Sequence, residues 1–209
     1  MKNKLKVLVA CEYSATVRDA FAALGHDAWS CDLLPSDKGG KHIQGNVLDI
    51  LDQGWDLMIA HPPCTYLCNS GVQHLHKEEG RWGLLDEGAA FFKALLECDI
   101  PRIAVENPIP HKYAVKRIGR KYDQLVQPYH FGHMETKATC FWLKGLSPLR
   151  HTSNLKKQTM ALPAGQRQRL HWLPQGPNRW KLRSQTYQGI ADAIASQWGA
   201  EVSQQYALF

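Results

Sequence analysis

The sequence predicts an α/β fold built on a mainly parallel β-sheet with an antiparallel hairpin at one edge. Short apolar runs alternate with amphipathic segments through the first two-thirds of the chain, as in strand–helix–strand units. The last third begins with two strand-like runs that are close enough in sequence to form a hairpin. The 209 residues, 44% hydrophobic and 21% charged, suffice for one domain with a hydrophobic core.

The first two elements are expected to be a strand and a helix. Lys6–Cys11 is apolar and β-branched, and Thr16–Leu24 carries apolar residues at helical spacing. Ser14 is the expected N-cap of this helix and Gly25 the expected C-cap. The start of the chain also resembles a secretion signal, but its apolar run is interrupted by Lys6 and is shorter than the roughly 7–15 residues required. We therefore expect a cytoplasmic protein.

The next elements continue the alternation. Leu84–Leu96 is expected to be a long amphipathic helix. Proline residues end two of the neighbouring apolar runs, which favours strands there. The segments expected to be parallel strands are His26–Cys31, Ile43–Leu48, Asp56–Ala60 and Arg102–Val105.

The last third has a different pattern. Leu125–Tyr129 and Ala138–Leu143, joined near Gly132, predict the antiparallel hairpin. Gly145–Asn178 is rich in Pro, Gly, Gln and basic residues and has no clean period, which predicts either a long loop or a small irregular subdomain. Thr186–Trp198 is expected to close the chain as a helix.

Charge is unevenly distributed along this chain, whose net charge is +6. Residues 1–135 carry 15 basic and 17 acidic side chains, whereas residues 136–209 carry 10 basic and 2 acidic ones. Such one-sided charge is typical of a protein that binds a polyanion such as DNA. The alternative is a basic solvated loop. We interpret residues 145–182 as a basic loop or minimal DNA-contacting subdomain, beside a main domain of residues 1–144 and 183–209. Trp142 is expected in the core. The expected DNA contacts are Arg167, Arg169, Trp172, Arg179, Lys181 and Arg183.

Reactive and polar residues follow four of the expected strands. In open α/β sheets, ligands bind beyond the carboxyl ends of the strands. An acid after the second strand can accept hydrogen bonds from both hydroxyl groups of a ribose. No G-x-G-x-x-G or Walker loop follows the first strand, which argues against a pyrophosphate. S-adenosylmethionine, which has a ribose and no phosphate, fits this pattern. The four segments are Cys11-Glu12-Tyr13-Ser14, Asp32-Leu33, His61-Pro62-Pro63-Cys64 and Glu106-Asn107-Pro108.

Pro62-Pro63-Cys64 followed by Glu106-Asn107 resembles the paired catalytic motifs of DNA cytosine-5 methyltransferases. Gly45-Asn46-Val47 resembles the family's adenine-contacting motif, and Tyr187-Gln188-Gly189-Ile190-Ala191 resembles its closing motif beside the cofactor. The resemblance implies an S-adenosylmethionine-dependent methyltransferase (Rossmann-like) fold. It also implies a small, phage- or prophage-like enzyme with a reduced target-recognition region. The cofactor site that it implies comprises Cys11, Glu12, Tyr13, Ser14, Asp32, Leu33, Asn46, Pro62 and Gly189.

The resemblance implies covalent catalysis on the cytosine ring. Cys64 would add to carbon 6, and protonated Glu106 would hydrogen-bond ring N3. Asn107 would orient the surrounding loops by hydrogen bonding. A target base in a duplex would have to be flipped out of the stack.

Two motifs depart from the family pattern. The family's first loop is Gly-rich, whereas this chain has Cys-Glu-Tyr-Ser. Its Gln-x-Arg-x-Arg motif is matched by position at Glu135–Thr139, where Lys137 would replace an arginine and complete the catalytic set. Gln166-Arg167-Gln168-Arg169 matches the letters better but lies in the irregular segment, so we interpret it as a basic loop.

Other interpretations fit parts of the sequence. The same chemistry could act on a free cytosine nucleotide, or the chain could be a non-catalytic methyltransferase-like module that binds DNA. Cys64, Cys68, His74 and His76 have a spacing that admits zinc, but structural zinc sites usually have tighter cysteine pairs, so no metal is expected. These histidines and His61 are expected on a mobile, solvated loop. The cysteines expected as core thiols are Cys11, Cys31, Cys98 and Cys140.

Overall fold

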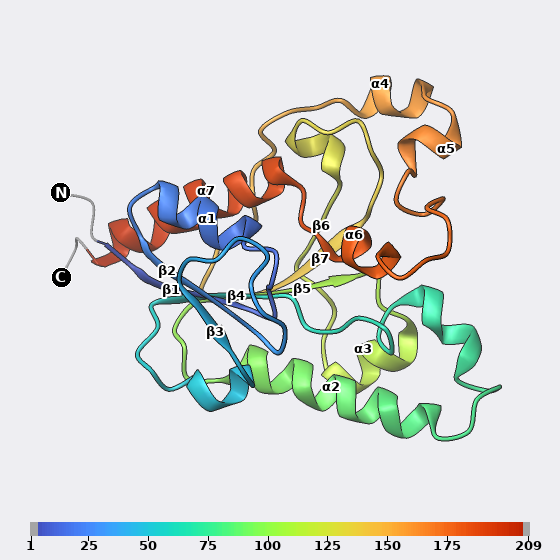
Figure 1. The fold of residues 1–209 in the computed structure, drawn as a ribbon, viewed down its shortest axis with the longest axis horizontal. Helices are drawn as coiled ribbons and strands as arrows, with labels where there is room; N and C mark the ends of the chain where they lie inside the picture. The colour runs from blue at the N-terminus through green and yellow to red at the C-terminus, as the bar shows by residue number, and fades with distance from the viewer. Residues whose placement is uncertain (1–3, 207–209) are drawn as a thin grey trace.

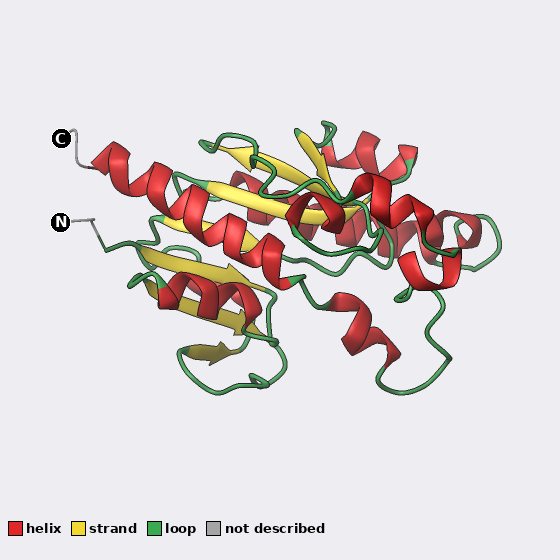
Figure 2. Cartoon of the chain, turned by 90° about the horizontal axis from the view of Figure 1, so that it is seen from above, coloured by secondary structure: helices red, strands yellow, loops and turns green. Residues whose placement is uncertain are grey.

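The computed structural model describes residues 4–206, which form a seven-stranded sheet between two layers of helices (Figure 1, Figure 2). The strand order is β3-β2-β1-β4-β5-β7-β6, and only the pairs that involve β7 are antiparallel. The predicted α/β fold class is confirmed, because the sheet is mainly parallel and has an antiparallel edge. The strands are β1 (Lys6–Ala10), β2 (Asp27–Asp32), β3 (His42–Gln44), β4 (Leu57–Ala60), β5 (Ile103–Pro108), β6 (Gln124–Val126) and β7 (Thr139–Lys144).

Helices α1 and α7 cover one face of the sheet, and α2 and α3 cover the other (Figure 1). Within residues 4–206, no helix has both the length and the apolar character that crossing a bilayer requires. The α-helices are α1 (Thr16–Ala23), α2 (Arg81–Glu97), α3 (Lys112–Ile118), α4 (Lys156–Ala161), α5 (Ala164–Arg167), α6 (Arg179–Ser184) and α7 (Gln188–Tyr206). Three 3-10 helices are η1 (Val47–Ile50), η2 (Asn69–His74) and η3 (Pro128–Phe131).

Neighbouring residues of the central strands pack against opposite helix layers. Leu8 and Met58 belong to the hydrophobic cluster on the α2 side, whereas Val7 and Leu57 belong to the cluster on the side of α1 and α7. Because both faces are covered, these strands are apolar at nearly every position, which is the pattern that predicted them. Trp142 is fully buried on the α2 side, as predicted.

Two predicted strands are shorter in the structure because helical turns follow them. β3 does not reach Leu48, since Asn46 Oδ1 accepts a hydrogen bond from the Leu48 N–H at 3.1 Å and caps η1. β6 ends before Tyr129, since Pro128 begins η3.

Other predicted elements are longer. β5 continues to Pro108 because every one of its residues pairs with β7. Glu106 and Asn107, which were expected just beyond the strand, therefore lie inside it. α2 and α7 extend past their predicted ends, and α3 was not predicted.

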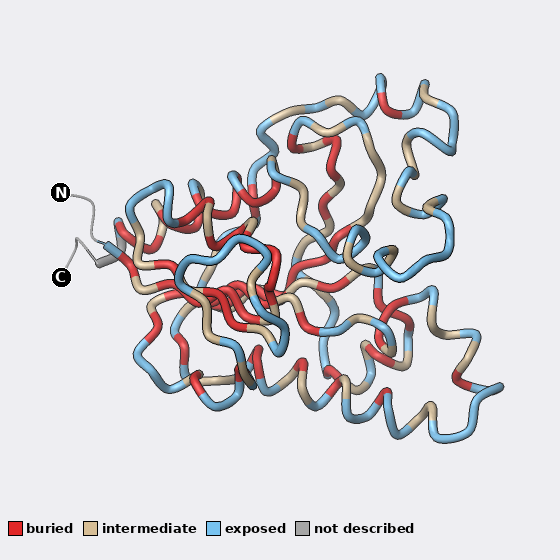
Figure 3. Tube along the Cα trace, viewed as in Figure 1, coloured by how far each residue is buried: buried red, intermediate tan, exposed pale blue. Residues whose placement is uncertain are grey.

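Residues 145–182 form an arm that leaves the sheet after β7, passes through α4 and α5, and returns toward the sheet through α6 (Figure 1). Most of this arm is exposed (Figure 3). Leu149 and Thr159 are its buried residues. The Leu155 N–H donates to the Tyr129 carbonyl oxygen at 2.9 Å, which fastens the start of the arm to η3.

His130 in η3 predicts a pH dependence of stability. Its ring stacks on His151 with centroids 3.7 Å apart. Burial lowers the pKa of His130, and the neighbouring His151 and Lys156 lower it further. The His130 ring therefore binds a proton more readily in the unfolded chain than in the folded one. Its contribution to folding stability is complete above the ordinary histidine pKa of about 6.5 and is lost as pH falls toward the folded-state pKa. We expect the urea concentration at the unfolding midpoint to decrease as the pH is lowered from about 7 to about 5. In His130→Gln this decrease should be smaller. An identical pH slope in the variant would contradict this assignment.

Candidate functional site

The predicted catalytic residues come from adjoining strands. Glu106 lies in β5, and His61 is the residue directly after β4, the parallel neighbour of β5. His61 Nδ1 lies 3.4 Å from Glu106 Oε2. Cys64 follows in the loop after β4, and Lys137 precedes β7, the other neighbour of β5. The placement of His61 corrects the sequence-based expectation of a solvated loop, because its side chain is only 11% exposed.

Cys64 and Cys68 share one turn, in which the Cys68 N–H donates to the Cys64 carbonyl oxygen at 3.0 Å. The hydrogen bond between the two side chains raises the pKa of Cys64, as do burial and the charge of Glu106, whereas Lys137 lowers it. The same hydrogen bond lowers the pKa of Cys68 to about 5, and hydrogen bonds from Ser70 lower it further. Cys64 must lose its proton before it can act as a nucleophile.

The loop that carries Cys64 is held by the segment after β5. The His111 N–H donates to the Leu67 carbonyl oxygen at 3.1 Å. The His111 side chain is buried and caps α3, where Nδ1 accepts from the Ala114 N–H at 3.0 Å. Nε2 must then carry the hydrogen, and it donates to the Tyr66 carbonyl oxygen at 2.9 Å. Both ring nitrogens of His111 have hydrogen-bond partners, so His111 holds the loop that carries Cys64 in place.

The segment before α7 covers Lys137. The Lys137 Nζ donates to the carbonyl oxygens of Arg183 at 2.7 Å and Gln185 at 3.2 Å. Burial is the main cause that lowers the pKa of this lysine. Tyr187 Oη donates to Glu135 Oε2 at 2.7 Å. The cavity lined by Lys137 and Tyr187 measures about 20 Å³, which holds about one water molecule and excludes a pyrimidine. A molecule larger than water would fit here only after some of the lining residues had moved.

The loop after β1 adopts turns that favour glycine, although it contains none. Cys11 and Ala15 have φ angles of 57° and 62°. A non-glycine residue in the left-handed region costs roughly 1–2 kcal/mol. This loop therefore reaches, with strained residues, the tight turns that a Gly-rich loop reaches without strain.

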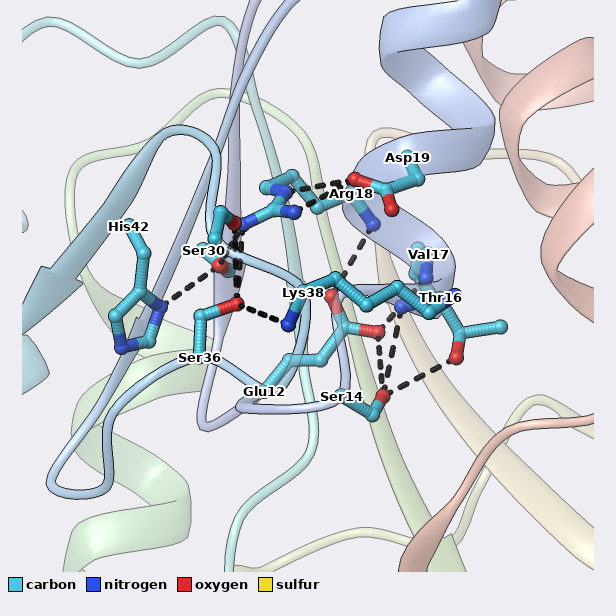
Figure 4. Close-up of polar contacts among 11 residues, drawn as sticks. Glu12, Ser14, Thr16, Val17, Arg18, Asp19, Ser30, Ser36, Lys38 and His42 are labelled. Carbon is cyan, nitrogen blue, oxygen red and sulfur yellow. Dashed lines mark hydrogen bonds and ion pairs between the residues drawn. The ribbon is translucent and has the colours of Figure 1, made fainter.

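The side chain that caps α1 is Glu12, and the prediction of Ser14 as N-cap was wrong. Ala15 is the N-cap residue and offers no side-chain cap. The Glu12 carboxylate is 5% exposed and accepts hydrogen bonds from the N–H groups of Val17 at 2.7 Å and Arg18 at 3.1 Å (Figure 4). This carboxylate therefore shapes the predicted cofactor loop through the helix that follows it.

Arg18 joins α1 to the loop between β2 and β3. It is 3% exposed, and its guanidinium group donates to Asp19 Oδ1 at 2.7 Å, Ser30 Oγ at 3.3 Å and Ser36 Oγ at 3.4 Å (Figure 4). Ser30 Oγ also lies 2.9 Å from His42 Nδ1. A buried arginine with three oxygen partners holds this side of the predicted cofactor site in place.

Asp32 and Leu33 lie at the carboxyl end of β2, the edge of an open α/β sheet where ligands bind. Asp32 Oδ1 accepts from the Leu34 N–H at 2.9 Å, while Oδ2 has no hydrogen-bond partner among residues 4–206. The Leu33 side chain is 73% exposed and presents an apolar surface beside this carboxylate. Asn46, also predicted here, uses its side-chain oxygen to cap η1. A free carboxylate oxygen beside an exposed leucine fits a ribose and an adenine ring.

Two further predicted cofactor residues have clear structural roles. The Gly189 N–H donates to His133 Nε2 at 3.0 Å. A Cβ atom at Gly189 would come within 2.0 Å of the Phe131 carbonyl oxygen, so only glycine fits at the start of α7. Pro62 is buried directly after His61.

Tyr13 connects the first loop to α6. Its Oη lies 2.8 Å from Ser184 Oγ, and its ring centroid lies 5.7 Å from that of Trp180. Lys181 Nζ pairs with Asp37 Oδ1 at 3.1 Å in the loop after β2. Because Lys137 binds the end of the same helix, α6 bridges the predicted cofactor and catalytic residues.

Several cations predicted to contact DNA have partners within the chain. Arg169 Nη2 pairs with Glu135 Oε1 at 3.0 Å. Arg167 Nη1 donates to the Leu162 carbonyl oxygen at 2.7 Å, and Arg179 also donates to backbone carbonyl groups. Trp172, by contrast, is 63% exposed. Some guanidinium groups of the basic arm therefore stabilise the conformation of the arm itself.

One cavity of the structure is lined by none of the predicted catalytic residues. That cavity, of about 500 Å³, lies between α1 and α7, and the predicted cofactor residue Gly189 lines it. All six cysteines are free thiols, of which Cys31 and Cys140 are buried as predicted, while Cys11 and Cys98 are partly buried. Among residues 4–206, no group of three or more His, Cys, Asp or Glu side chains is arranged to hold a metal ion.

No family model and no curated protein matches the sequence. Among solved structures, the chain is similar to a protein described as a DNA modification methyltransferase encoded within a prophage of E. coli, with 14% identity over 77% of this chain and 56% of that chain and a TM-score of 0.45. It is also similar to the Entamoeba histolytica methyltransferase EhMeth, with 14% identity over 73% of this chain and 58% of that chain and a TM-score of 0.46. For the S. pombe Dnmt2 methyltransferase the identity is 13%, over 70% of this chain and 51% of that chain, and the TM-score is 0.42. The chain thus spans little more than half of the length of these structures, and its function has to be inferred from the site.

Proposed function

We propose that this protein transfers a methyl group from S-adenosylmethionine to carbon 5 of cytosine in DNA through a covalent adduct on Cys64. One observation carries the proposal. Cys64, Glu106 and Lys137 come from the adjoining ends of β4, β5 and β7, where the charges of Glu106 and Lys137 both act on the Cys64 thiol. A thiol, a carboxyl group and a cation are the groups needed to attack and hold a pyrimidine.

Cys64 acts as the nucleophile in this proposal. Carbon 5 of cytosine is a poor nucleophile until a thiolate adds to carbon 6, which breaks the ring conjugation and gives carbon 5 enamine character. After carbon 5 has been alkylated, it gives its proton to solvent water, and the electrons of that bond form the ring double bond again as the carbon–sulfur bond breaks. Cys64 leaves as a thiolate and is ready for another cycle.

Glu106 holds the ring during this addition. In its protonated form it donates a hydrogen bond to ring N3, and the ring then accepts the electrons of the new adduct more easily. Lys137 supplies a positive charge beside the same ring, which favours the developing negative charge. Its present partners are backbone carbonyl oxygens, so it becomes available when residues 183–187 move.

S-adenosylmethionine, when bound, supplies an electrophilic methyl group on a sulfonium. Asp32 would accept hydrogen bonds from the ribose hydroxyl groups, and Leu33 would cover the adenine. The loop from Cys11 to Ser14 would enclose the remainder. Glu12 keeps this loop in shape by capping α1.

DNA is the proposed substrate because the acid-free run from Thr136 to Ala191 contains ten basic residues. We propose residues 145–182 as the minimal DNA-contacting segment, with Trp172 as a stacking platform. A free cytosine nucleotide is the second candidate. It is favoured by the internal partners of Arg167, Arg169 and Arg179, which reduce the number of guanidinium N–H groups free to bind a long polyanion.

Transfer of label from the radioactive cofactor to DNA tests the proposal. The purified protein is incubated with duplex DNA, single-stranded DNA or dCMP, and bisulfite sequencing locates any product. We expect label in DNA at cytosine carbon 5. A matched oligonucleotide with 5-fluorocytosine should trap a denaturation-resistant adduct, because fluorine cannot leave as a proton. Labelled dCMP alone would support the second candidate. Cofactor-independent DNA binding without any transfer would support a non-catalytic module.

A further inference from the structure

We infer that His61 is a positioning residue for Glu106: its ring fixes the carboxyl group so that the opposite oxygen meets the base. The inference rests on the proposed function, because it extends the role given to Glu106. No contact between His61 and Glu106 was predicted from the sequence. His61 directly precedes Pro62 at the end of β4.

The backbone brings the two side chains together. In the parallel β4–β5 pair, Ala60 stands opposite Val105, so the next residues along, His61 and Glu106, are neighbours across the ladder. The His61 N–H donates to the Ala10 carbonyl oxygen at 2.9 Å, which continues the β1–β4 pairing by one residue. His61 is thus held by the sheet and not by a mobile loop.

The contact between the side chains is specific. His61 Nδ1 lies 3.4 Å from Glu106 Oε2, and the two side chains are 11% and 20% exposed. Within residues 4–206, His61 is the hydrogen-bond partner of the Glu106 carboxyl group. Lys137, the nearby cation, uses its Nζ on backbone carbonyl oxygens instead. The orientation of Glu106 therefore depends on His61.

A comparison with His111 separates this role from ordinary packing. The buried ring of His111 has both nitrogens satisfied, by the Ala114 N–H and the Tyr66 carbonyl oxygen. The buried Nε2 of His61 has no partner within residues 4–206. An unpaired buried nitrogen destabilises the folded state, so an apolar residue would serve better if packing were the only requirement. The contact with Glu106 is what a histidine adds at this position.

The geometry also assigns the tautomer. When Glu106 donates to ring N3 from a protonated Oε1, its Oε2 can only accept, so His61 Nδ1 carries the hydrogen and Nε2 has a free lone pair. With Oε2 engaged by His61, Oε1 is the oxygen that remains for ring N3. His61 thus acts through Glu106 and need not touch the substrate.

Substitutions at His61 test the inference. Asn places an amide donor at the position of Nδ1, whereas Leu removes it at similar volume. We expect His61→Leu to lower kcat by roughly 10- to 100-fold with an almost unchanged KM for DNA, and His61→Asn to recover most of the loss. In a Glu106→Gln background, His61→Leu should add less than about 3-fold, because coupled residues are not additive. Full kcat in His61→Leu, or equal losses in both backgrounds, would overturn the inference.

An imidazole ¹⁵N spectrum provides a readout that does not depend on activity. In the wild type we expect the Nδ1–H tautomer at His61, and a shift of its signals in Glu106→Gln but no comparable shift of the His111 signals. An Nε2–H tautomer that is insensitive to Glu106→Gln would refute the pairing. If the wild type methylates no substrate while the spectra behave as expected, the proposed function fails and the His61–Glu106 pair stands.

Discussion

Replacing Cys64 with alanine is expected to abolish methyl transfer, with a loss of more than about a thousandfold, because the bond to carbon 6 is assigned to the Cys64 sulfur. The 5-fluorocytosine adduct should disappear as well. The fold should be retained, since Cys64 is only partly buried and its backbone, not its side chain, closes the turn with Cys68. Label transfer, adduct formation and the thermal midpoint are the three measurements. A variant that still transfers methyl groups at the wild-type rate would rule out the covalent mechanism.

Cys68→Ala is the matched control, because it removes the second thiol of the same turn. The adduct should still form in this variant and map to Cys64 by peptide mass spectrometry. Removing Cys68 also removes the largest cause that raises the pKa of Cys64. Cys64 then ionises at lower pH, so the pH–rate profile of adduct formation should move toward lower pH. Adduct formation in Cys64→Ala and its loss in Cys68→Ala would show that the nucleophile had been assigned to the wrong cysteine.

The sheet could be predicted because strands that are buried on both faces appear in the sequence as continuous apolar runs. A strand such as β4, with four buried residues, can only be an apolar run, and Pro62 marks its end. Short 3-10 helices leave a weaker mark. η1 begins because the Asn46 side chain accepts a hydrogen bond from the backbone N–H two residues later. Such a local hydrogen bond competes with the backbone hydrogen bonds of a strand, and the sequence pattern does not show which of them forms.

The two candidate matches to the Gln-x-Arg-x-Arg motif show why parts of the site could not be predicted from the sequence. Glu135–Thr139 and Gln166–Arg169 were competing matches, and the structure places them side by side: the Thr136 N–H donates to the Arg167 carbonyl oxygen at 2.7 Å, and Arg169 pairs with Glu135. Nothing local in the sequence indicates these partners, which are about thirty residues apart. His61 was different, because aligning the ends of β4 and β5 in parallel register would have placed it beside Glu106.

Glu12→Ala is expected to lower the free energy of unfolding by roughly 2–4 kcal/mol, the second large effect. The substitution leaves the N–H groups of Val17 and Arg18 unpaired in a buried place and removes a negative charge from the positive end of α1. Urea unfolding measures it. Glu12→Gln should lose less, since its amide oxygen can still accept one of the two hydrogen bonds.

Ser14→Ala distinguishes the observed cap from the one that the sequence predicted. If Ser14 were the N-cap, its loss would cost about 1 kcal/mol or more, and Glu12→Ala would cost little. In the structure, Ser14 Oγ lies 3.4 Å from the Thr16 N–H and 3.3 Å from Glu12 Oε1, so we expect a cost below about 0.5 kcal/mol. Glu12→Ala should also weaken cofactor binding, because Cys11 and Ala15 keep their left-handed turns only while the carboxylate ties the loop to α1. A fully stable Glu12→Ala variant would mean that the loop holds its strained conformation by other contacts.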